Sequence, residues 1–133
     1  MNLLQKTSTF ILILFIVSFA HQPKHWIFYG IRILLPLLFL TSYMFWGNPI
    51  KDGFWHIADR TLVRLMLFLS VIYTIFYNTP VWTDVYILLV CLFFISALGS
   101  KYYSGLEWGS LDHIRMHAFL HYYGFILGIF TIG

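Results

Sequence analysis

The sequence predicts an all-α, polytopic bundle of about five transmembrane helices that forms a single domain over residues 1–133. Three observations support this. The chain is 60% hydrophobic and only 10% charged, whereas about a quarter of the residues in a soluble domain are charged. Its apolar residues gather in five segments, each close to the ~20 residues that cross a bilayer. Short connections containing Pro, Gly or Asn separate these segments.

The first segment, residues 3–20, has two interpretations. Lys6 precedes its apolar run, and Ser18-Phe19-Ala20 resembles a signal-peptidase site. The segment is therefore either an uncleaved first span or a signal peptide, and cleavage after Ala20 would leave four spans in the same orientation. The second segment, residues 26–46, contains Pro36, a residue type that kinks helices.

The remaining segments cover residues 57–78, 81–99 and 111–132. The breaker sequences Asn78-Thr79-Pro80 and Gly99-Ser100 are expected to end the third and the fourth. Cys91, the only cysteine, lies within the fourth segment and is expected to pack as a small hydrophobic residue.

The basic residues predict the orientation. Those that fall on or near the N-terminal side of a five-span bundle are Lys6, Lys51, Arg60, Arg64 and Lys101. The opposite side carries Lys24 and Arg32. The positive-inside rule therefore predicts that the N-terminus of this multi-pass membrane protein is cytosolic. The net charge of +3 is too small and too scattered to indicate nucleic-acid binding.

Histidines in the fifth segment are the main candidate for a functional site. His113, His117 and His121 are four residues apart and share one helical face. At the same side of the membrane, the third segment begins near His56 and Asp59, which also share a face. Ionisable groups within a bilayer are costly and usually face a protein interior, a cavity or a partner. Because zinc binds imidazole and carboxylate groups, His56, Asp59, His113 and His117 are predicted to form a zinc site that could activate water.

Two glycines extend this stripe. Gly124 and Gly128 project to the same face as His117 and His121. Small residues four apart allow helices to approach closely, so this face is expected to point into the bundle, as are the faces bearing His56 and Asp59. The glycine pair is also a candidate contact for a homo- or hetero-oligomer. Membrane lipids are the other expected partners.

The His-x-x-x-His pattern of the last segment, with a His and an Asp early in another, resembles a membrane hydrolase superfamily. It includes alkaline ceramidases, progestin and adiponectin receptors and myomaker-related proteins. The resemblance implies a zinc-dependent lipid amide hydrolase with His56, Asp59, His113 and His117 as the metal ligands. That family has seven helices and a serine near its early histidine, where this chain has five segments and Asp52.

Other functions remain open from the residues alone, and no catalytic residue is assigned. The chain could be a non-enzymatic scaffold or accessory subunit in which the histidines form a helix-packing seam. Haem binding by two histidines needs pairs on facing helices, and only His56 could face those of the fifth segment. A proton or ion pathway along the stripe is a further alternative, because histidine titrates near neutral pH.

Overall fold

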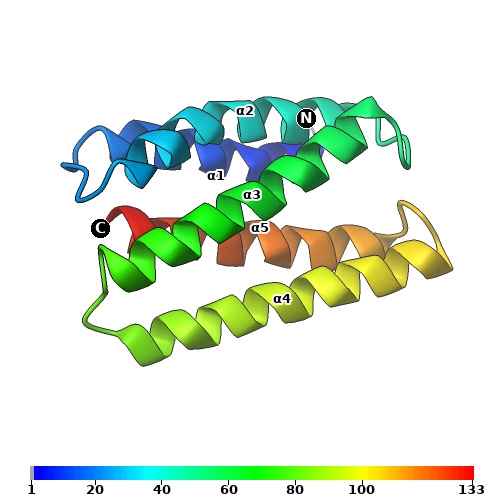
Figure 1. Cartoon of the computed structure of the whole chain (residues 1–133). Coiled ribbons are helices and arrows are strands. Elements are labelled where there is room, and N and C mark those ends of the chain that lie inside the picture. Colours follow the sequence, from blue (N-terminus) through cyan, green and yellow to red (C-terminus); the bar gives the residue numbers. More distant parts are fainter. Residues whose placement is uncertain (1) are drawn as a thin grey trace.

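The computed structural model describes residues 2–133 and folds them into five α-helices (Figure 1). These are α1 (Leu3–Ser18), α2 (Ile27–Gly47), α3 (Phe54–Phe76), α4 (Thr83–Leu106) and α5 (Leu111–Ile132). No strand occurs among residues 2–133, so the all-α prediction is confirmed. Two helices, α2 and α4, are long and apolar enough to cross a membrane, and α1 is shorter, at 16 residues. A bundle in which all five helices cross remains a prediction.

Local side-chain contacts explain where several helices begin. A capping box opens α1, in which the Asn2 side chain accepts from the Gln5 backbone N–H at 2.9 Å and the Gln5 side chain accepts from the Asn2 N–H. Ser110 caps α5 by accepting from the His113 N–H at 3.2 Å. Gly109 adopts a φ of +76° in the turn before it, a conformation that favours glycine.

The predicted end of the fourth segment at Gly99-Ser100 is wrong, because α4 continues to Leu106. A Cβ atom at Gly99 would collide with the end of the Met116 side chain on α5. Ser100 shares a hydrogen bond of 3.0 Å with His117 Nδ1, also on α5. These small residues therefore bring two helices together and do not terminate one.

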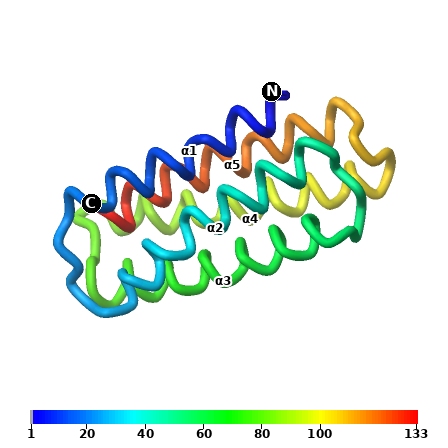
Figure 2. The backbone as a smooth tube through the Cα atoms, turned by 90° about the horizontal axis from the view of Figure 1, so that it is seen from above, coloured from blue at the N-terminus to red at the C-terminus, as the bar shows by residue number. Residues whose placement is uncertain are grey.

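Helix α5 occupies the centre of the bundle. It packs against α1 on one side and α4 on the other, and it touches α3 (Figure 1). Helices α1 and α5 run side by side in the same direction (Figure 2). Within the described chain, α4 packs against α5 alone. The consecutive helices α3 and α4 are therefore not packed together, and a space remains between them.

Helix α1 is an integral part of the packing. Ser8 and Ser42, both fully buried, share a hydrogen bond of 2.8 Å between α1 and α2. Leu14 of α1 fills the space beside Gly128 of α5 and belongs to a buried cluster with residues of α2 and α3. If α1 were a signal peptide that is cleaved off, the bundle would lose the contacts of Ser8 and Leu14. Cys91, expected to pack as a small hydrophobic residue, lies exposed on the surface of α4 and is not part of the core.

The glycines of α5 face neighbouring helices of the same chain. A Cβ atom at Gly124 would lie 3.4 Å from Phe93 Cε2 on α4. One at Gly128 would lie 2.9 Å from Leu14 Cδ2 on α1. The expectation that this face points into the bundle is confirmed. Since these contacts are intramolecular, they give no support to an oligomer through the same glycines, which stays a prediction.

Candidate functional site

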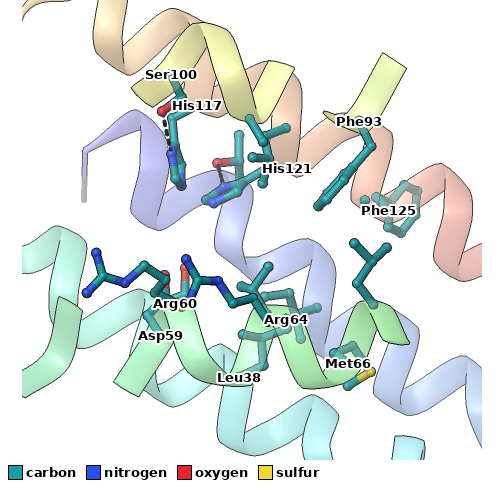
Figure 3. A pocket seen from close by; sticks show the side chains of 18 of the residues that line it. Leu38, Asp59, Arg60, Arg64, Met66, Phe93, Ser100, His117, His121 and Phe125 are labelled. Carbon is teal, nitrogen blue, oxygen red and sulfur yellow. Dashed lines mark hydrogen bonds between the residues drawn. The ribbon is translucent and has the colours of Figure 1, made fainter. Parts of the chain in front are cut away.

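A cleft of about 660 Å³ lies between α3 and α4. It exists because these helices do not pack on each other, and α5, α1 and α2 close its floor. Its lining is mostly apolar. Figure 3 shows Met66, Phe93 and Phe125 around one end, with Leu38 closer to Arg64. Pockets of ~300–1,000 Å³ with mostly apolar walls are typical of small-molecule sites.

Polar side chains concentrate at the other end of the cleft. Arg60 and Arg64 extend from α3, opposite His117 and His121 of α5 (Figure 3). Lys101 of α4 also lines this end. The cleft is therefore amphiphilic along its length: one end carries charged and imidazole groups and the other is hydrocarbon.

Hydrogen bonds to neighbouring helices hold two of the histidines. His117 Nδ1 is 3.0 Å from Ser100 Oγ on α4, and His121 Nδ1 is 2.6 Å from Thr7 Oγ1 on α1 (Figure 3). The helical stripe predicted from the sequence is present, with ring centroids of His117 and His121 4.9 Å apart. The stripe links three helices at the polar end of the cleft, as the packing-seam alternative expects.

The other two predicted histidine ligands accept hydrogen bonds from nearby backbone. His56 Nδ1 accepts from the Asp52 N–H at 2.8 Å, and His113 Nδ1 accepts from the Gly109 N–H at 3.1 Å. In a neutral imidazole whose Nδ1 accepts, the proton is on Nε2, which is then a donor. A histidine that binds a metal through Nε2 instead donates from Nδ1. His56 and His113 are thus held in the tautomer that disfavours metal binding at Nε2.

The remaining predicted ligand, Asp59, is buried and turns toward α2. Its nearest polar partner is Thr41 Oγ1, which donates to it at 3.5 Å. The Trp108 ring contacts both His56 and His113, with centroid distances of 5.3 and 5.0 Å. Across residues 2–133, no three His, Cys, Asp or Glu side chains are grouped as metal ligands. The four side chains as placed here do not fit a zinc centre.

Sequence reasoning did not identify several residues of the cleft. Arg60 and Arg64 are four residues apart and therefore share a face of α3. This spacing could have indicated a shared site, but arginines near the end of a span usually extend to lipid head groups. Ser42 also lines the cleft, where it bonds to Ser8. No local pattern indicates that Trp46 or Lys101 lines the same cavity.

Comparison with known proteins provides no relative: no family model, curated protein or solved structure matches the chain.

Proposed function

We propose that the chain is a multi-pass membrane protein whose five helices all lie in the bilayer and whose cleft between α3 and α4 holds one lipid molecule. The observation that carries the proposal is the amphiphilic cleft of about 660 Å³, bounded by two helices that do not pack together. Binding, and not catalysis, is the activity that this geometry supports best.

The outer surface supports a membrane location for all five helices. Each helix exposes large apolar side chains, for example Ile16, Ile33, Phe68, Ile95 and Phe119. Such extensive apolar exposure on every helix is unfavourable in water. The weaker apolar character of α1, α3 and α5 has a structural reason, because polar residues such as Ser8, Asp59 and His113 are buried. In a bilayer these residues face protein, as their cost in hydrocarbon requires.

The location of the cleft suits a lipid. A cavity between two unpacked helices of a membrane bundle opens toward the surrounding acyl chains, so an amphiphile can enter sideways without crossing water. The hydrocarbon end, near Met66 and Phe93, matches an acyl chain. The polar end, near Arg64 and His121, provides the donors that a head group needs.

Lipid retention tests this function. The full chain is purified in mild detergent, and native mass spectrometry counts the bound lipids. We expect about one lipid per wild-type chain, most of which Ala97→Phe should lose because Ala97 lines the cleft. The matched control is Ile95→Phe, since Ile95 is 59% exposed on the outside of α4. Wild-type protein without lipid, or equal retention by Ala97→Phe, would contradict the proposal.

The zinc-dependent hydrolase implied by the family resemblance stays a separate hypothesis. Elemental analysis of the purified protein tests it directly. Near-stoichiometric zinc that is lost in His117→Ala would support the predicted metal site and would require different tautomers for His56 and His113 than those found. Absence of metal, with His117→Ala folding normally, would leave the histidines with a structural or lipid-binding role.

A further inference from the structure

The charges that line the cleft are unbalanced. Its basic residues are Lys51, Arg60, Arg64 and Lys101, and its acidic residues are Asp52 and Asp59. Arg60 Nη1 lies 3.8 Å from Asp52 Oδ1, and Lys51 Nζ lies over the Trp108 ring at 5.9 Å. The Asp59 carboxylate is buried against Thr41 on the α2 side. Among residues 2–133, nothing pairs with the charged groups of Arg64 and Lys101.

The depth of Arg64 makes this imbalance informative. It lies ten residues beyond the start of α3 at Phe54, or ~15 Å along the helix axis. His121 is equally far from the start of α5, and in Figure 3 the Arg64 side chain extends along the opposite wall of the cleft toward Arg60. A cation at such depth in a membrane normally pairs with an anion or faces water.

A buried indole provides an independent indication of a missing acceptor. Trp46 is 3% exposed and lines the cleft, and its ring centroid is 4.6 Å from that of His117. Its Nε1–H, which can only donate, has no hydrogen-bond partner among the described residues. His56 and His113 also line the cleft, and their Nδ1 atoms already accept, so their Nε2–H groups are donors too. The polar end is rich in donors and cations and poor in acceptors.

We infer that the cleft selects a lipid with an anionic phosphate head group, bound by Arg64 and Lys101 at the polar end. The inference rests on the proposed lipid-binding function. Phosphate oxygens accept several hydrogen bonds at once, and a guanidinium can bind two of them in parallel. The apolar end then holds acyl chain, so that the lipid lies along the cleft with its phosphate beside Arg64. Trp46 and the histidines contribute neutral donors around it.

The experiment compares lipids that differ only in the head group. The full chain is reconstituted in phosphatidylcholine nanodiscs that contain a minor fraction of phosphatidylglycerol or of diacylglycerol with the same acyl chains. Bound lipid is quantified after repurification in mild detergent. We expect phosphatidylglycerol to be enriched over diacylglycerol by at least ~10-fold, because one hydrogen bond to a charged group contributes ~1.5–3 kcal/mol, or roughly 10- to 100-fold. Phosphatidylcholine also carries a phosphate, but its choline cation offsets that charge and is repelled by Arg64 and Lys101, so we expect a smaller enrichment of phosphatidylglycerol over phosphatidylcholine.

The variant Arg64→Gln/Lys101→Gln should lose this preference and still retain neutral lipid. Arg115→Gln is the control, since Arg115 is exposed on α5 and does not line the cleft; it should behave as wild type. Retention without head-group preference, or a preference that survives the double substitution, would overturn the inference and leave the lipid cleft intact. Retention of no lipid would instead overturn the proposed function itself.

A last arm separates a lipid from a soluble phosphate ester. Lipid-depleted protein in detergent is titrated with glycerol 3-phosphate while its thermal unfolding is followed. We expect no stabilisation at millimolar concentration, because the apolar end of the cleft stays unfilled. Stabilisation equal to that given by phosphatidylglycerol would identify a soluble phosphate as the ligand and refute the lipid assignment.

Discussion

Alanine at Gly128 is expected to disrupt the contact between α5 and α1. The new Cβ atom would lie 2.9 Å from Leu14 Cδ2 and 3.2 Å from Leu14 Cγ, whereas carbon atoms in contact normally lie ~3.5–4.0 Å apart. Leu14 is 5% exposed and lines the cleft, so rotation of its side chain into that space can relieve part of the collision. Overpacking of this kind costs about 1–3 kcal/mol. Alanine gains ~0.8–1.0 kcal/mol in helix propensity over glycine, so the net loss should reach at most about 2 kcal/mol.

Gly30→Ala is the matched control, because nothing lies within 4 Å of a Cβ atom at Gly30 in α2. Gly30→Ala should gain helix propensity without overpacking any neighbouring side chain. The difference between the two variants therefore isolates the packing cost of ~1–3 kcal/mol. Equilibrium unfolding in mixed micelles, followed by fluorescence of the 5 tryptophans, measures both. Adding Leu14→Ala to Gly128→Ala should relieve the collision. Equal effects of Gly128→Ala and Gly30→Ala, or strictly additive effects of Gly128→Ala and Leu14→Ala, would refute the reasoning.

Three further predictions use other parts of the bundle. Deleting residues 2–20 should abolish cooperative unfolding in the same assay, because α1 packs against both α2 and α5; a deleted chain that unfolds like wild type would count against this. Ser42→Ala should lower the free energy of unfolding by about 0.5–1.5 kcal/mol, because Ser8 loses a buried partner at 2.8 Å; the exposed Thr61→Ala should change it by less than ~0.5 kcal/mol. Reporter fusions should place the N-terminus in the cytosol and the C-terminus on the opposite side; finding both on one side of the uncleaved chain would exclude five spans.

Most of the helix positions follow from the lengths of the apolar segments and from the breaker residues that separate them. The predicted segments 26–46 and 57–78 thus lie within a few residues of α2 and α3. The error at the end of α4 has a specific cause. A glycine followed by serine is ambiguous in sequence, since it either ends a helix or admits a neighbouring one, and only the position of Met116 and His117 on α5 distinguishes the two.

The site was less predictable for a geometric reason. Helical periodicity correctly brings His113, His117 and His121 onto one face, but it contains no information on ring rotation or tautomer. Those depend on backbone donors outside the stripe, such as the Gly109 N–H that His113 accepts from. Periodicity also cannot reveal that Trp108 contacts both His56 and His113. The cleft itself depends on how α5 packs between neighbours, a property of the whole bundle.

The packing of α4 against α5 alone has a mechanical consequence. If the chain is stretched from its ends, α5 bears load directly at the C-terminus. Once α5 separates from α1 and α3, no packing contact holds α4 to the rest of the bundle. The last two helices should then leave as one extension event, whereas α1, α2 and α3, which pack on one another in order, can resist separately. A force–extension trace of the full chain should therefore show fewer rupture steps than helices, and the first step taken from the C-terminal end should release both α5 and α4.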